Sequence, residues 1–247
     1  MTIASGQSES RRYIGSRLIL LPTCDLTDTS FVTPDRYIVG EGGITPRPTV
    51  VNREPKMSTR EVVQLIRKMR NPHDKSATQA VAELRAHGWL IDGTLERSSL
   101  QHVHLQGVDL TNANLQKVDL SHADLQGADL SLVNLQDARL RQTNLYKADL
   151  SKANLKNADL SRANLNRARN ISNEQLAQAH RLMGATMPGG DLYDGRFNLE
   201  GDTEFARTGG VDTEDKAKMA AFYGVSVQEY ERGQQWRRDH RQGTQAA

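Results

Sequence analysis

Apolar and polar residues alternate with a period of five through the middle of the chain. From Leu95 to Leu165 a leucine stands at every fifth position, which gives fifteen leucines in one register. From Val103 to Ala163, the residue two positions before each leucine is Val, Ala or Thr. The residue between the two is polar and most often Asp or Asn. This spacing decides which backbone the segment can adopt.

Neither regular element places all of these leucines on one side. On an α-helix, five steps of about 100° leave successive leucines about 140° apart, so they would spread around the whole surface. On a straight strand, an odd spacing sends successive leucines to alternate faces. A short strand of two or three residues followed by a turn, repeated, turns every Ala and Leu inward. The pattern therefore predicts a solenoid of short strands around a narrow core.

The repeat unit also resembles that of a known family. The run ADLSKANL at residues 148–155 resembles the A(D/N)LxX unit of pentapeptide-repeat proteins, and the resemblance extends over residues 93–170. It implies a mainly β fold, a right-handed quadrilateral β-helix with four units per coil. With strands about 4.8 Å apart, the segment would form about four coils. We expect α-helical caps at both ends, since an open solenoid exposes its core and its strand edges.

The residues before the repeat predict a helical cap that covers residues 57–92. Ser58 and Glu61 form a capping box, and apolar residues at helical spacing follow it. A second helix is predicted over residues 75–86. Residues 1–56 have no sustained period and contain five of the seven prolines, so we expect a disordered or loosely ordered N-terminal extension there.

The residues after the repeat predict three further segments. We expect a capping helix over residues 171–184 and a turn-rich connection over residues 185–211, with residues 191–204 extended or looped. Residues 212–247 then predict a C-terminal helical hairpin and tail, with a capping box at Ser226 and Glu229.

Composition and charge fit this picture and narrow the function. Apolar residues make up 37% of the chain and aromatic residues only 5%, which suits a core of Leu and Ala. The net charge is +3 over residues 1–94, +2 over 95–170 and −3 over 171–247. Some pentapeptide-repeat proteins mimic DNA and bind topoisomerases. A duplex carries one negative charge per about 1.7 Å, so a weakly positive repeat argues against that activity.

Outward-facing residues of the repeat form columns when coils of twenty residues are stacked. Asp109, Asp129 and Asp149 form one column, which ends at Arg169. The column is either a solvated face whose Asp residues organise turns or a docking stripe for basic groups. With the outward-facing Leu132 and Tyr146 and two aromatic residues of the hairpin, we select one candidate interaction surface: Asp109, Asp129, Asp149, Leu132, Tyr146, Tyr230 and Trp236.

The sequence offers no set of residues for catalysis, a cofactor or a metal. His102 and His122 are expected to stack near His104, but Asp124 is the one evident further ligand, and zinc sites use four ligands. No nucleophile with a base and an orienting group is evident, and no Gly-rich phosphate loop follows a strand. We therefore expect a protein that is not an enzyme and has no cofactor and no bound metal.

The single cysteine, Cys24, cannot form an internal disulfide, and the apolar run at residues 18–21 is too short for an export leader or a membrane span. We expect a cytoplasmic, non-enzymatic scaffold or protein–protein interaction module with an unidentified protein partner. One alternative is a DNA-binding regulator that uses the C-terminal hairpin, although the net charge of that region argues against nucleic acid. The other is a DNA-mimicking protein that interacts with a topoisomerase, against which the charge of the repeat argues.

Overall fold

A computed structural model describes residues 37–40, 43–46, 58–71 and 76–241 and divides the chain into two units, residues 1–53 and 54–247. In the first unit, β1 (Tyr37–Gly40) pairs antiparallel with β2 (Gly43–Pro46). The expectation of a disordered or loosely ordered extension is therefore wrong for these two strands, where aromatic and β-branched residues favour pairing. Cys24 and residues 18–21 lie outside the described residues.

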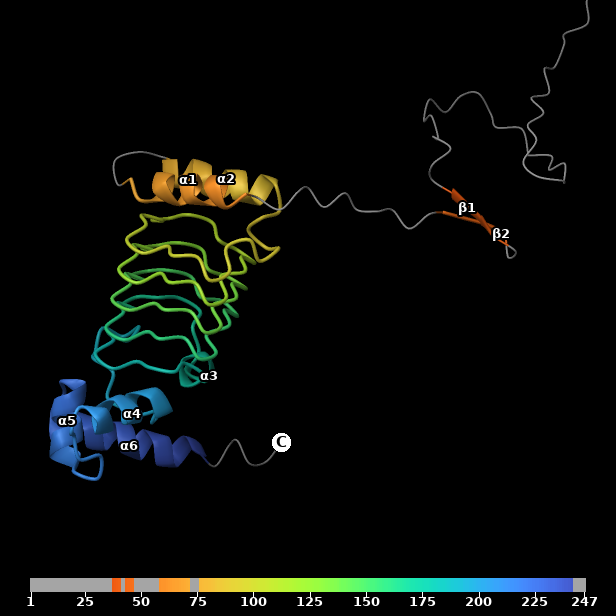
Figure 1. The fold of residues 1–247 in the computed structure, drawn as a ribbon. Coiled ribbons are helices and arrows are strands. Elements are labelled where there is room, and N and C mark those ends of the chain that lie inside the picture. The colour runs from red at the N-terminus through yellow and green to blue at the C-terminus, as the bar shows by residue number, and fades with distance from the viewer. Residues whose placement is uncertain (1–36, 41–42, 47–57, 72–75, 242–247) are drawn as a thin grey trace, which may run out of the picture. The chain divides into compact units, whose positions relative to one another are not determined.

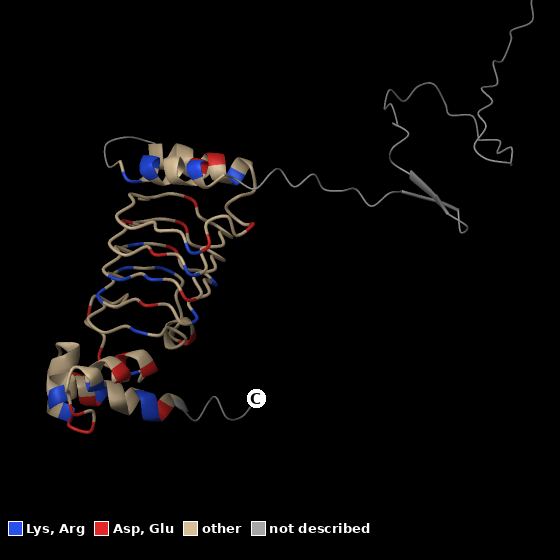
Figure 2. Cartoon of the chain, in the orientation of Figure 1, with Lys and Arg blue, Asp and Glu red and all other residues tan. Residues whose placement is uncertain are grey.

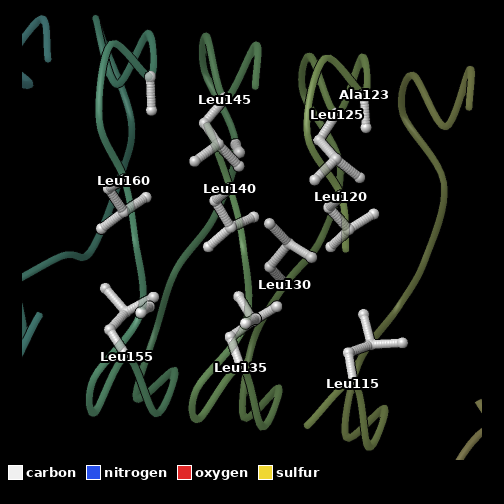
Figure 3. Close-up of a cluster of buried hydrophobic side chains, with 14 of the residues drawn as sticks. Leu115, Leu120, Ala123, Leu125, Leu130, Leu135, Leu140, Leu145, Leu155 and Leu160 are labelled. Atoms are coloured by element: carbon white, nitrogen blue, oxygen red, sulfur yellow. The ribbon is translucent and has the colours of Figure 1, made fainter. Parts of the chain in front are cut away.

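The second unit contains the solenoid that the period of five predicts (Figure 1). Isolated parallel β-bridges join residues twenty positions apart, as between Asp109 and Asp129 and between Asp129 and Asp149. The Leu130 amide donates to the Asp149 carbonyl at 2.8 Å, which links one coil to the next. Each coil therefore contains twenty residues, or four units. All fifteen leucines from Leu95 to Leu165 are buried, which confirms their inward orientation (Figure 3).

The turns explain why Asp and Asn stand between the inward residues. The second residue after each leucine, from Arg97 to Arg167, has a positive φ. The values lie between 54° at Lys152 and 66° at Gly127. The side chain of the preceding Asp or Asn accepts the amide N–H two residues further on, as Asp129 does from Ser131 at 2.9 Å. Such Asx turns close the corners at which an Asp or Asn stands.

Two helices pack against the first coil, as the N-terminal pattern predicts. They are α1 (Thr59–Met69), whose N-cap Ser58 forms the expected capping box, and α2 (Ser76–Ala86). The Met69 carbonyl accepts the amide N–H of His104 at 2.7 Å, so the end of α1 supplies an acceptor to the edge of the first coil. The helices thus cover apolar residues and satisfy a strand edge that would otherwise be open.

The solenoid continues beyond residue 170, so the capping helix predicted over residues 171–184 is present only at its start and is wrong beyond residue 177. The helix α3 (Asn173–Ala177) is only five residues long. After it, Arg181 pairs with Asp159 in a parallel bridge, and Thr186 pairs with Asn164. These pairs lie 22 residues apart rather than twenty, because the coil accommodates α3 with two additional residues.

The resumed coil also corrects the turn-rich connection predicted over residues 185–211. Leu182, Ala185 and Met187 are buried and continue the inward columns. The Leu165 amide donates to the Thr186 carbonyl at 2.9 Å. Residues 191–204 were expected to be extended or looped, and residues 191–199 contain no helix. The expectation is wrong for residues 200–204, which begin α4 (Glu200–Thr208).

The C-terminal residues form the predicted helical hairpin, α5 (Lys216–Tyr223) and α6 (Val227–Arg241). Ser226 and Glu229 form the expected capping box. Aromatic rings join the hairpin to the chain that follows the last coil: Tyr223 meets Tyr193 edge-on at 5.4 Å, and Trp236 meets Phe197 at 5.5 Å between ring centroids. The described residues contain no helix that is both long and apolar enough to cross a membrane.

Candidate interaction face

One side of the solenoid carries five of the seven residues that the sequence analysis selected. The central column runs from Asp109 through Asp129 and Asp149 to Arg169, each bridged to the next. The turns at either end of these short strands form the two edges of the side. We call this side the Asp face and define it by its four segments: residues 106–112, 126–132, 146–152 and 166–169.

The three carboxylates of the Asp face close turns. Asp109, Asp129 and Asp149 each accept the amide N–H two residues further on, at 2.9 to 3.0 Å. Hydrogen bonding from Thr111 lowers the pKa of Asp109, and hydrogen bonding from Ser131 lowers the pKa of Asp129, because these bonds favour the charged form. Asp109 and Asp129 are therefore ionised at neutral pH, and all three carboxylates use part of their hydrogen-bonding capacity to close turns.

Two of the carboxylates also have partners from outside the column. Arg85 of α2 forms an ion pair with Asp109 at 3.0 Å, and the Asn170 side chain donates to Asp149 at 2.8 Å. Asp129 lies between them and forms no ion pair among the described residues. The docking stripe for basic groups that the sequence suggested is thus reduced to two carboxylates without a cationic partner among the described residues, Asp129 and Asp149.

The charge on the Asp face changes sign along the solenoid axis. Acidic residues stand in its first two segments, whereas the later segments carry four exposed cations, and Figure 2 shows Lys and Arg along the later coils. The Lys147 ammonium lies 5.2 Å and the Arg167 guanidinium 5.9 Å from the ring centroid of Tyr146. Lys152 and Arg169 complete the group, and none of the four forms an ion pair among the described residues. We call these four residues the basic end.

Leu132 stands at one edge of this face, in its second segment, and is 50% exposed, the outward orientation that the sequence predicts. Its φ is 60°, in the left-handed region, which costs a residue with a Cβ about 1 kcal/mol. The equivalent positions of the neighbouring coils hold Asn112 and Lys152. Neither burial nor backbone preference explains a leucine at this turn. Tyr146, one coil further on, is half-buried.

The remaining two candidate residues do not belong to this surface. Tyr230 is buried, and its ring stacks on Tyr223 at 6.1 Å. Trp236 is half-buried between the rings of Phe197 and His240. Their use as an exposed interaction surface is therefore wrong for Tyr230 and limited for Trp236, because the hairpin uses these aromatic rings to pack within the protein.

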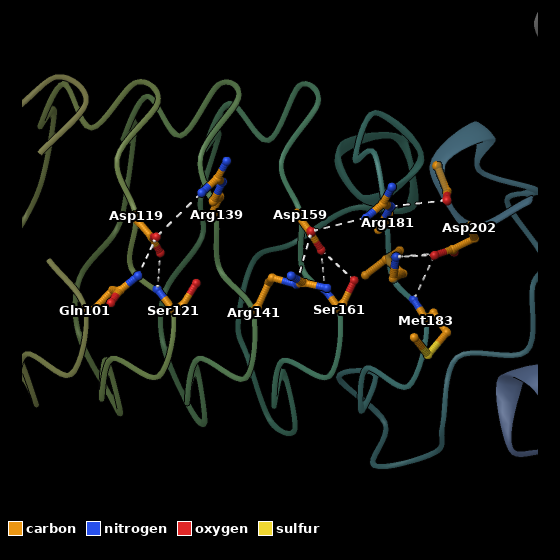
Figure 4. A network of polar contacts seen from close by, with 12 residues as sticks. Gln101, Asp119, Ser121, Arg139, Arg141, Asp159, Ser161, Arg181, Met183 and Asp202 are labelled. Carbon is orange, nitrogen blue, oxygen red and sulfur yellow. Dashed lines mark hydrogen bonds and ion pairs between the residues drawn. The ribbon is translucent and has the colours of Figure 1, made fainter. Parts of the chain in front are cut away.

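A second polar column, shown in Figure 4, was missed by the sequence analysis. Asp119, Arg139, Asp159 and Arg181 alternate in sign from coil to coil and are bridged in sequence. Their carboxylates and guanidinium groups approach to 3.9 Å, and Arg141 adds a contact of 3.4 Å to Asp159. The alternation of charge at twenty-residue spacing was the signal that could have revealed this column.

This column leads to a buried carboxylate at the last coil. Asp202 of α4 is fully buried and accepts the amide N–H groups of Leu182 and Met183 at 3.1 to 3.3 Å (Figure 4). Removal from water raises its pKa to about 7, and the charge of Asp159 adds to this effect. Asp202 thus joins α4 to the resumed coil through two backbone amides.

The expected histidine pair is present on another edge. The rings of His102 and His122 stack at 4.8 Å between centroids. Within the described part of the chain, no three His, Cys, Asp or Glu side chains come together in a way that could hold a metal ion.

The repeat matches a family model described as pentapeptide repeats, with eight copies over residues 95–131 and 134–169. A solved pentapeptide repeat protein from Nostoc PCC 7120 is 34% identical, over 34% of this chain and 78% of that chain, with a TM-score of 0.15. The chain belongs to the pentapeptide-repeat family.

Two further pentapeptide-repeat structures are similar to this chain. A protein of the Arabidopsis thaliana thylakoid lumen is 27% identical, over 40% of this chain and 65% of that one, with a TM-score of 0.32. HetL of the cyanobacterium Nostoc, involved in heterocyst differentiation regulation, is 29% identical, over 40% and 61%, with a TM-score of 0.22. The matched region spans less than two thirds of both proteins. No curated protein matches the chain.

Proposed function

We propose that this pentapeptide-repeat protein is a non-enzymatic scaffold that binds a protein partner through the Asp face of a right-handed quadrilateral β-helix closed by helices at both ends. We also propose that it acts in the cytoplasm, since Cys24 is its one cysteine and cannot form an internal disulfide.

The observation that carries this proposal is the exposed Leu132. Burial of a half-exposed leucine contributes little to stability, and its left-handed backbone conformation is unfavourable. Folding alone therefore gives no reason for a leucine at this position. Lys152 of the basic end occupies the equivalent turn of the next coil, and Tyr146 lies at the opposite edge of the same face. Aromatic, aliphatic and Arg side chains gathered on a rigid surface are the composition of interface hot spots. The solenoid core is filled with Leu and Ala, which leaves its outer side chains as the chemical features available to a partner.

The test exchanges residues of the Asp face for those of neighbouring coils. Leu132→Asn introduces the residue found at position 112, and Tyr146→Gln introduces the residue found at positions 106 and 126, so the turn geometry is preserved. The matched control makes the same kind of exchange on another edge: Asp137→Asn after position 157 and Lys156→Gln after position 136.

Affinity purification from the native host then compares the wild type, the Asp-face variant and the control, with proteins identified by mass spectrometry. We expect at least one protein to be retained by the wild type and the control and lost by the Asp-face variant. If every retained protein is common to all three baits, or is lost equally from both variants, the proposal is wrong. Circular dichroism of the variants verifies that each remains folded.

A further inference from the structure

We propose that the ligand of the Asp face is an acidic segment of a partner protein, with an apolar side chain on Leu132 and its carboxylates on the basic end. This inference rests on the proposed function and specifies the chemistry of the partner. Its basis is the basic end, whose four cations form no ion pair among the described residues.

The four cations of the basic end are presented together. Lys147 and Lys152 occupy turns at the two ends of one short strand, and Arg167 and Arg169 belong to the next coil. Neighbouring strands of a sheet are about 4.8 Å apart, so two carboxylates spaced along an extended segment can reach cations of both coils. Elsewhere in the solenoid, Arg139 and Arg141 are paired with carboxylates. The other cations, which also form no ion pair among the described residues, lie on other edges: Arg97, Lys117, Lys156 and Arg162. The basic end differs from them because four cations lie on two neighbouring coils of one face.

The carboxylate within the basic end does not neutralise it. Asp149 accepts hydrogen bonds from the Ser151 amide and the Asn170 side chain, and it forms no ion pair among the described residues. One acidic residue, Asp149, among four cations leaves this part of the face positive. Exposed side chains of opposite charge then attract one another, and they do so less as salt increases.

The limits of the positive area favour a protein segment over a nucleic acid. The same column carries Asp129 and Asp109 in the preceding coils, and Asp129 has no cationic partner among the described residues. A continuous phosphate backbone that followed the face would meet these carboxylates, whereas nucleic-acid sites carry basic groups along their whole track. Leu132 lies at the boundary between the two charges and offers an apolar contact, which a phosphate backbone cannot use.

The contribution of Tyr146 is to hold two of the cations in place. The Lys147 ammonium and the Arg167 guanidinium both lie within 6 Å of the ring centroid, at 5.2 and 5.9 Å, in the range of cation–π attraction. Tyr146 therefore limits the freedom of these side chains before a ligand binds, and this lowers the entropic cost of binding.

The test measures binding of a fluorescein-labelled peptide by fluorescence anisotropy, at low and at physiological ionic strength. The peptide has glutamates on both sides of a central pair of leucines. The comparison peptides replace all glutamates by lysines or both leucines by glutamates, and a single-stranded DNA oligonucleotide of similar charge is the fourth probe. The full chain is used throughout.

Two charge variants make the comparison specific. Lys147→Gln/Lys152→Gln removes two cations of the basic end, and Arg97→Gln/Lys117→Gln removes two cations from another edge. All four residues occupy the same left-handed turn position, with φ between 54° and 60°, so the variants are matched in charge and in backbone. We expect the first variant to bind the acidic peptide about five- to tenfold more weakly, and the second to bind it as the wild type does.

Leu132→Asn tests the apolar contact. It should weaken binding of the leucine-containing peptide and leave binding of the all-glutamate peptide unchanged. The proposal is overturned if the wild type binds the lysine peptide or the DNA as tightly as the acidic peptide, or if both charge variants lose the same affinity. Failure to bind the acidic peptide also overturns it. The lysate comparison is independent, so a partner lost there by the Asp-face variant would leave the proposed function intact.

Discussion

Asp202 is expected to make the attachment of α4 to the last coil depend on pH. Its carboxyl group is fully buried and accepts the amide N–H groups of Leu182 and Met183. Its pKa is raised to about 7: burial is the main cause, the two amide hydrogen bonds oppose it, and the charges of Asp159 and Arg181 have smaller effects in opposite directions. The informative change is Asp202→Asn, which keeps an acceptor of the same size and removes the titration.

The sign of this pH dependence follows from the protonation of Asp202 in the folded and in the unfolded chain. The pKa of an exposed Asp is about 3.9, so between that pH and about 7 the folded protein holds a proton that the unfolded chain has released. The contribution of Asp202 is therefore complete below about pH 4 and is lost as the pH rises through about 7. A difference of one proton corresponds to a slope of at most about 1.4 kcal/mol per pH unit in the free energy of unfolding.

The assay is denaturant unfolding of the wild type and the Asn variant between about pH 5 and pH 8, followed by circular dichroism. The seven histidines titrate in the same range, so the informative quantity is the difference between the two proteins. The free energy of unfolding of the wild type should fall relative to that of the variant as the pH rises. Parallel pH profiles, or a relative gain by the wild type at high pH, would refute the reasoning.

Three further predictions concern the core and the surface. Leu140→Ala removes a fully buried side chain and should lower the free energy of unfolding by about 2–5 kcal/mol in urea. Thr143→Val keeps the side-chain volume but removes the hydrogen bond to the Leu120 carbonyl at 2.8 Å, so the same measurement should show a loss of about 1 kcal/mol. Arg85→Gln removes an exposed ion pair and should cost less than about 1 kcal/mol in thermal unfolding. A loss from Arg85→Gln as large as that from Leu140→Ala would contradict this ranking.

The solenoid could be predicted from the sequence because its signal is strict. The spacing of Ala and Leu leaves one backbone solution, and the buried leucines confirm it. The resumed coil was missed because α3 interrupts the period and shifts the register to 22 residues. The unit Ala185-Thr186-Met187 still has the Ala–polar–apolar pattern, but it precedes Pro188 and two glycines, which indicate a turn.

The candidate surface was predictable only for the part that the repeat governs. The family resemblance implies four units per coil, and stacking at that spacing predicted the column of Asp109, Asp129 and Asp149. The period of five also predicted that Leu132 and Tyr146 face outward. The hairpin has no such period. The partners of its aromatic rings lie in the chain between the last coil and α4, and no sequence spacing indicates that packing.

The twenty-residue coil also determines how the two ends of the solenoid are oriented about its axis. Each unit of five residues turns the chain by one quarter of a coil, so deletion of one unit would rotate every later side chain by a quarter turn about the axis. The C-terminal hairpin would rotate with them relative to α1 and α2. Deletion or duplication of a whole coil would instead change the separation of the two ends by about 4.8 Å and keep their orientation. The number of repeats thus determines both the distance between the two ends of the solenoid and the angle between them.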